Sequence, residues 1–189
     1  MNHDKSVTQM CPEPDMLSIV QAMGDTDVQA LQVLDASRRK WPYDPRVHLL
    51  LGALHASQQQ YDPARSALEE ALRLSPDYPI ASFMLGFLEL VNGHVERAEL
   101  AWVALDALPV DDTLRIFKFG LISLTRDRFA EALQRLQQGV ASNTQYPLIN
   151  RYIHSVIEQV RGAMDRHDES NHDDSGPSFS TPYGTPSRS

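Results

Sequence analysis

A spacing of thirty-four residues recurs along this chain and constrains its fold more than any other feature. The pairs Leu51-Gly52, Leu85-Gly86 and Phe119-Gly120 are each separated by this interval. Twelve residues after each glycine comes an alanine (Ala64, Ala98, Ala132), and a large apolar residue follows each alanine by four (Leu68, Trp102, Leu136). Self-similarity at one fixed period of this length predicts an array of stacked repeats, in which each unit packs on its neighbours.

A degenerate earlier unit carries Leu17, Ala30, Leu34 and Pro42 at the positions of Leu51, Ala64, Leu68 and Pro76. The whole pattern resembles the tetratricopeptide repeat, whose units place small residues where two antiparallel helices touch and a proline at the exit turn. The resemblance implies an all-α fold, a helical-hairpin solenoid of about four repeats with a C-terminal capping helix.

The same register predicts the boundaries of the parts. Residues 1–10 are expected to be a flexible N-terminus, and residues 11–165 to form the solenoid. Its units would span about 11–44, 45–78, 79–112 and 113–146, followed by a capping helix at 147–165. From residue 166 to 189 the chain is acidic and rich in Ser and Pro, with few aliphatic residues, so we expect a disordered tail.

In the family that this pattern resembles, certain positions of the first helix of each unit face a bound ligand on the concave surface. When these ligand-facing positions are transferred to this chain, they and their neighbours give a group of residues that we predict to bind a partner. Its members are Arg46, Leu49, Ala53, Ile80, Phe83, Phe87, Leu90, Val91, Leu114, Phe117, Lys118, Leu121 and Leu124. Since only Arg46 and Lys118 are cationic, a clamp for a peptide carboxylate is not expected. The set predicts a hydrophobic groove for an apolar peptide or helix.

The alternative is that these apolar residues pack against the second helices of the units and form ordinary core. We favour the groove because another set, including Leu51, Leu68, Leu85, Trp102 and Phe119, is available to fill the core. The predicted function is then a non-enzymatic adaptor or chaperone that binds another protein. Its size, acidity and apolar groove are also similar to the small bacterial chaperones of type III secretion translocators. The competing hypothesis is a structural subunit, or a homodimer, whose groove is permanently filled.

Composition narrows the function classes further. A formal net charge of -8 with scattered basic residues argues against nucleic-acid binding. No apolar run approaches the roughly 20 residues that span a bilayer, so no membrane insertion is expected. Cys11 is the single cysteine, and the N-terminus lacks the apolar run of a signal peptide, so we expect a cytoplasmic protein.

No pattern typical of a catalytic, cofactor or metal site is present: His48 and His55 lie too far apart to share a zinc ion.

Overall fold

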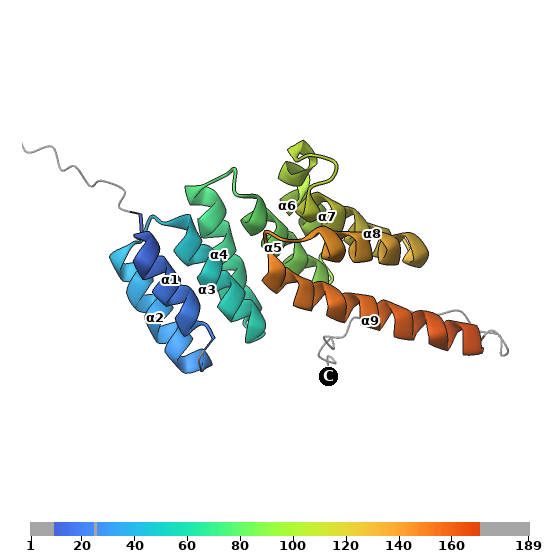
Figure 1. Cartoon of the computed structure of the whole chain (residues 1–189), viewed down its shortest axis with the longest axis horizontal. Coiled ribbons are helices and arrows are strands. Elements are labelled where there is room, and N and C mark those ends of the chain that lie inside the picture. The colour runs from blue at the N-terminus through green and yellow to red at the C-terminus, as the bar shows by residue number, and fades with distance from the viewer. Residues whose placement is uncertain (1–9, 25, 171–189) are drawn as a thin grey trace, which may run out of the picture. The chain divides into compact units, whose positions relative to one another are not determined.

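The computed structural model describes residues 10–24 and 26–170, and within these ranges the regular structure is entirely helical (Figure 1). The helices are α1 (Glu13–Ala22), α2 (Asp27–Lys40), α3 (Pro45–Ser57), α4 (Tyr61–Leu74), α5 (Pro79–Val91), α6 (Val95–Ala101), the 3-10 helix η1 (Val103–Ala107), α7 (Thr113–Leu124), α8 (Phe129–Ser142) and α9 (Pro147–Ser170). The all-α prediction is confirmed. Most of the predicted flexible N-terminus and tail, residues 1–9 and 171–189, lies outside the described residues.

The chain forms two compact units, Met1–Leu88 and Glu89–Ser189, and the division falls inside α5. In the first unit, α1 packs on α2, α2 on α3, and α3 on α4. In the second, η1 packs on α6 and on α7, α7 on α8, and α8 on α9 (Figure 1). Each contact joins elements adjacent in the sequence, as a helical repeat array requires.

Two of the three periodic glycines, Gly52 and Gly120, lie where the paired helices of their unit are in close contact. A Cβ atom added at Gly52 in α3 would lie 2.6 Å from Cγ of Leu68 in α4. At the equivalent position of the fourth unit, a Cβ on Gly120 in α7 would lie 2.8 Å from a Cδ atom of Leu136 in α8. Both leucines are completely buried, so neither can move aside. Glycine is required here because any larger residue would separate the helices.

The third unit departs from the others in its second helix. Helices α4 and α8 each have 14 residues, whereas α6 has 7 and gives way to η1 after Trp102. A 3-10 helix has three residues per turn, so Trp102 and Leu105 lie above one another, and both are buried. The last helix also differs from expectation, since α9 continues to Ser170 and passes the predicted end at residue 165.

A left-handed backbone position recurs with the repeat, between the two helices of the second, third and fourth units. Gln59, Gly93 and Asp127 have φ angles of 60°, 79° and 55°, and they are thirty-four residues apart. Only the middle one is glycine, for which this conformation carries no steric penalty. We therefore expect Gln59→Gly to raise the free energy of unfolding by roughly 0.5–1 kcal/mol, measured by urea titration. Gln58→Gly is the control: its φ is -87°, so glycine should bring no gain there.

Candidate functional site

The thirteen residues predicted to bind a partner divide between the two compact units. Residues up to Phe87 belong to the first unit, and those from Leu90 onward belong to the second. Their exposure separates them into two classes. Half-buried side chains are those of Arg46, Leu49, Ala53, Ile80, Phe87, Leu90 and Val91. Buried side chains are those of Phe83, Leu114, Phe117, Lys118, Leu121 and Leu124. The predicted groove was centred on Phe83, Phe87, Phe117 and Leu121, and only Phe87 of these four is not buried.

We predicted that Phe117 faces the groove because other residues, Phe119 among them, fill the core. The position of Phe117 in the structure contradicts this argument. Its ring is 0% exposed and lies over Gly139 of α8, where an added Cβ would be 2.5 Å from Cε1. Phe119, predicted to be core, is only half-buried. Phe117 therefore packs against the second helix of its own unit, which was the alternative interpretation. The glycine at 139 removes the side chain that would otherwise occupy the space of the ring.

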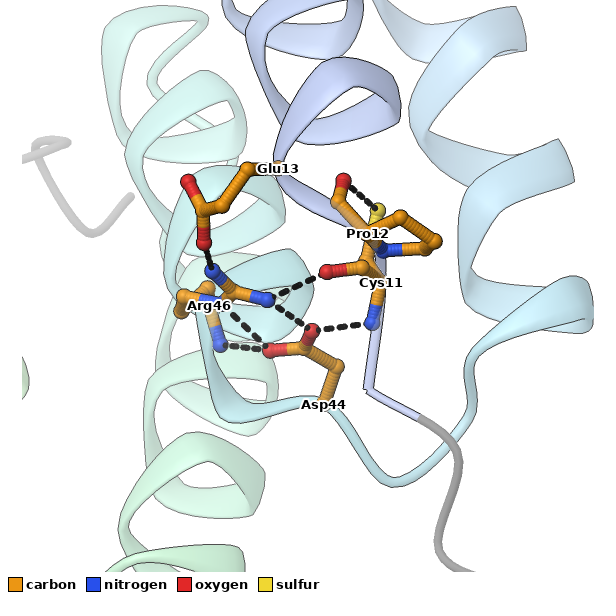
Figure 2. A network of polar contacts seen from close by, with 5 residues as sticks. All are labelled: Cys11, Pro12, Glu13, Asp44 and Arg46. Carbon is orange, nitrogen blue, oxygen red and sulfur yellow. Dashed lines mark hydrogen bonds and ion pairs between the residues drawn. The ribbon is translucent and has the colours of Figure 1, made fainter.

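Arg46 is engaged in a polar network that joins the start of α3 to the start of α1 (Figure 2). Its Nη2 atom donates to Oδ2 of Asp44 at 2.9 Å and to the carbonyl oxygen of Cys11 at 2.6 Å, and Nη1 pairs with Glu13. Asp44 is fully buried and also accepts from the backbone N–H groups of Cys11 (2.8 Å) and Arg46 (2.9 Å). The second of these bonds makes Asp44 the N-cap of α3.

The network shifts the pKa values of its members. Burial on its own raises the pKa of Asp44, but hydrogen bonds from the Arg46 side chain and from the Cys11 and Arg46 backbones together lower it below its ordinary value. The hydrogen bond to the Asp44 side chain, and after it the one to Glu13, raise the pKa of Arg46, although its partial burial lowers it. Burial, followed by the charges of Asp44 and Asp15, raises the pKa of the Cys11 thiol. Asp44 and Arg46 therefore stay ionised while Cys11 stays a neutral thiol at neutral pH.

Lys118, the second predicted cation, is also satisfied within the chain. Its Nζ atom lies 2.7 Å from Oδ1 of Asp106 and 3.1 Å from the carbonyl oxygen of Trp102. One repeat earlier, the positions of Lys118 and Asp106 hold the apolar residues Met84 and Leu72. The lysine thus stabilises the irregular turn between α6 and η1. Since both predicted cations already have carboxylate partners, neither is arranged to clamp a peptide carboxylate.

Comparison with known families agrees with the repeat register. A tetratricopeptide repeat model matches residues 22–79 and, in a second overlapping position, residues 49–112. The chain is a tetratricopeptide repeat protein. Tetratricopeptide repeats generally mediate protein–protein interaction. A search of curated proteins found no match, so the predicted similarity to type III secretion chaperones stays a prediction.

Helix α5 of this tetratricopeptide repeat protein has an inverted distribution of polar and apolar residues. Its two polar side chains, Ser82 and Glu89, are buried, and Oε2 of Glu89 lies 2.9 Å from Nδ1 of His94, whose N–H donates to it in the Nδ1–H tautomer. The half-buried positions are all apolar: Pro79, Ile80, Met84, Leu85, Phe87, Leu90 and Val91. Phe87 stacks on the buried ring of Phe83, with centroids 6.2 Å apart. The accessible surface of α5 is therefore hydrophobic.

Other site types find no support among the described residues. In the ranges 10–24 and 26–170, no group of three or more His, Cys, Asp or Glu side chains could hold a metal ion. None of the helices in the described part of the chain combines the length and apolar content needed to cross a membrane.

Sequence reasoning missed Asp44, the buried partner of Arg46. The signal was present in the dipeptide Asp44-Pro45, because an acidic N-cap followed by proline is typical of a helix start. What the sequence could not show was that Cys11 and Glu13 would meet Arg46 from thirty-three or more residues away.

Proposed function

We propose that this tetratricopeptide repeat protein is a non-enzymatic adaptor or chaperone that binds an apolar segment of another protein on α5. The observation that carries the proposal is the distribution of residues on α5, whose polar residues are buried and whose accessible residues are apolar. An apolar surface of this kind is favourable only when something covers it. Phe87, held by its stack on Phe83, is the rigid aromatic anchor that such interfaces favour.

Pairing of both predicted cations within the chain supports an apolar ligand over an acidic one. Arg46 is neutralised by Asp44 and Glu13, and Lys118 by Asp106. A partner carboxylate would have to displace one of these internal carboxylates. Bulky apolar side chains would meet no such competition on α5, so they are the expected anchors of the bound segment.

The test is a selection of peptides from a random display library on the full chain. We expect the selected peptides to carry bulky apolar residues at helical spacing. Phe87→Ala should weaken a selected peptide by about tenfold or more in fluorescence anisotropy. Leu148→Ala on α9 is the control, because Leu148 is 76% exposed and outside the proposed site. Thermal unfolding by circular dichroism should show both variants folded.

Two outcomes would contradict the proposal. One is a selection that yields no apolar peptide, and the other is an equal effect of Phe87→Ala and Leu148→Ala. Light scattering, which measures the oligomeric state, distinguishes this proposal from the competing hypothesis of a homodimer with a filled groove. A constitutive dimer that binds neither peptide nor an apolar dye would favour that structural role.

A further inference from the structure

The break in the second helix of the third unit is not explained by the residues of that helix. Residues 95–108 contain neither glycine nor proline, and half of them are alanine or leucine, which are good helix formers. The buried residues Ala98, Trp102 and Leu105 follow the spacing i, i+4, i+7 of one helix face. Even so, α6 ends at Ala101 and the chain continues as η1. The cause therefore lies in what this segment contacts.

Lys118 of α7 binds the segment at the point where α6 ends. Its buried Nζ atom donates to the carbonyl oxygen of Trp102 at 3.1 Å and pairs with Oδ1 of Asp106 at 2.7 Å. In a continuous α-helix, this carbonyl oxygen would accept from the backbone N–H of residue 106. In the structure it accepts from the N–H of Leu105 at 3.0 Å, which is the three-residue step of a 3-10 helix. The lysine thus contacts both residues that an α-helical hydrogen bond would join.

The repeat supplies the comparison that assigns the break to the cations of α7. The positions of Arg115 and Lys118 lie next to the second helix of the preceding unit, as Val47 and Leu50 pack in one cluster with Leu34 of α2. These two positions are apolar in the other helices that follow a second helix: Val47 and Leu50, Ala81 and Met84, Ile149 and Tyr152. The second helices that precede them, α2, α4 and α8, each run unbroken for 14 residues. In the described part of the chain, the second helix is broken only where these positions are cationic.

Pro109 is the competing explanation, because it comes one position earlier than its counterpart Pro76 predicts. A proline lacks the N–H that would bond to the carbonyl oxygen four residues before it, here Leu105, and it disfavours helical backbone at Leu108. Both effects act on the last turn, and Leu108 is extended, with a ψ angle of 157°. Neither effect reaches Trp102. The proline therefore explains where a continuous helix would end, but not why α6 stops at Ala101.

We propose that residues 102–107 form a two-state element, which Lys118 holds as η1 and which continues α6 as an α-helix to Ala107 once that contact is released. Nη1 of Arg115, which donates to the carbonyl oxygen of Leu108 at 2.6 Å, fixes the far end of the segment on α7.

The two states differ in length and rotation. A 3-10 helix rises about 2.0 Å and turns about 120° per residue, against about 1.5 Å and 100° in an α-helix. Over the five residues of η1, conversion shortens the segment by about 2.5 Å and rotates its end by about 100°. The connection to α7 moves with that end, so the conformation of the third unit is coupled to a contact made by the fourth.

The test is nuclear magnetic resonance of the full chain carrying Lys118→Met/Asp106→Leu, which introduces the residues found one repeat earlier, Met84 and Leu72. Removing both members of the ion pair leaves neither charge unpaired. In an α-helix the Hα atom of one residue lies close to the N–H of the residue four positions later, and in a 3-10 helix it does not. We expect such four-residue contacts within residues 102–107 of the variant and not in the wild type. The Cα chemical shifts of the same residues should move toward those of α4 and α8.

Arg126→Gln/Glu99→Gln is the matched control. This ion pair also joins α6 to the end of α7, at 3.5 Å, but its side chains are 59% and 43% exposed, so its removal should leave η1 unchanged. Pro109→Ala, which retains Lys118, should leave η1 unchanged as well. The proposal is overturned if either of these variants gains the four-residue contacts, or if Lys118→Met/Asp106→Leu keeps η1. Unfolding of the latter variant would also overturn it, because the proposal requires the continuous helix to be favoured once the lysine is gone.

Discussion

Replacing Asp44 with alanine is expected to lower the free energy of unfolding by about 3 kcal/mol, because a buried ion pair then loses one of its partners. The carboxylate is fully buried and holds three groups at once: the Arg46 guanidinium, the Arg46 backbone N–H and the Cys11 backbone N–H. Its removal leaves a guanidinium without its main partner and a buried N–H without an acceptor. It also removes the N-cap of α3.

The loss should be concentrated where α1 meets α3, since the Asp44 network ties the two together (Figure 2). Cys11 is a native reporter of that contact, because its thiol is buried and it is the single cysteine of the chain. In Asp44→Ala, a thiol reagent should label Cys11 faster, and hydrogen exchange should rise in residues 11–22. Urea titration measures the change in stability.

Asp62→Ala is the matched control, because Asp62 pairs with Arg65 at 2.8 Å but its side chain is 92% exposed. Removing an exposed pair should change stability by no more than about 0.5 kcal/mol. Equal losses for the two variants, or unchanged labelling of Cys11 in Asp44→Ala, would contradict the assigned role of Asp44.

The lowered pKa of Asp44 also predicts the sign of a pH effect. A carboxyl group whose pKa is lower in the folded chain adds stability above its unfolded pKa, and this contribution is lost as the pH falls through the folded pKa. The wild type should therefore lose stability more steeply below about pH 4 than Asp44→Asn, which has no charge to protonate. Parallel acid titrations of the two proteins would contradict this expectation.

Gly139→Ala is expected to lower the free energy of unfolding by about 1–2 kcal/mol, although alanine favours a helix over glycine. The new Cβ would lie 2.5 Å and 2.6 Å from two carbons of the Phe117 ring and 3.3 Å from Cγ2 of Ile116. Phe117 is completely buried and cannot swing into solvent. The overlap must be relieved by separating α7 from α8.

The repeat supplies the compensating substitution. In the second unit, Leu49 stands at the position of Phe117 and Ala71 at the position of Gly139. Leucine is smaller than phenylalanine and alanine is larger than glycine, so the two differences compensate in volume. Phe117→Leu/Gly139→Ala should regain at least about 1 kcal/mol over the sum of the single effects in a double-mutant cycle. Gly162→Ala is the control, since its nearest side-chain atom would lie at an ordinary 3.6 Å. Additive single effects would show that Phe117 does not pack on Gly139.

Much of the local architecture was predictable because it depends on short-range geometry repeated at a fixed interval. Gly52 and Gly120 predicted the close approach of paired helices, and Leu68 and Leu136 occupy the space they leave. The fourth unit was predicted to start at residue 113, where α7 begins, and Asp112 caps this helix by accepting from the N–H groups of Leu114 and Arg115. The break of the third unit's second helix into η1 was not predictable, because its residues keep the apolar spacing of a continuous helix.

The candidate site was less predictable than the fold. Positions transferred from a repeat pattern specify which side of a helix a residue occupies, but not how deep it lies. Phe83, Phe117 and Leu121 were predicted to line a groove and are buried, while Phe87, one turn after Phe83, is half-buried. Depth depends on the size of the residue opposite, and for Phe117 that residue is a glycine twenty-two positions away.

The sequence by itself determined that this chain is a repeat array with a thirty-four-residue period, and the resemblance of its small and bulky positions to the tetratricopeptide repeat implied the all-α fold. Only the tertiary structure decided which apolar residues remain accessible. It buried the polar residues of α5 and left Leu100, Val103 and Val110 of the third unit exposed. It also paired Arg46 with Glu13, thirty-three residues away, and Lys118 with Asp106, twelve residues away. The physical reason is that burial and ion pairing depend on distances between residues far apart in sequence, which no local pattern encodes.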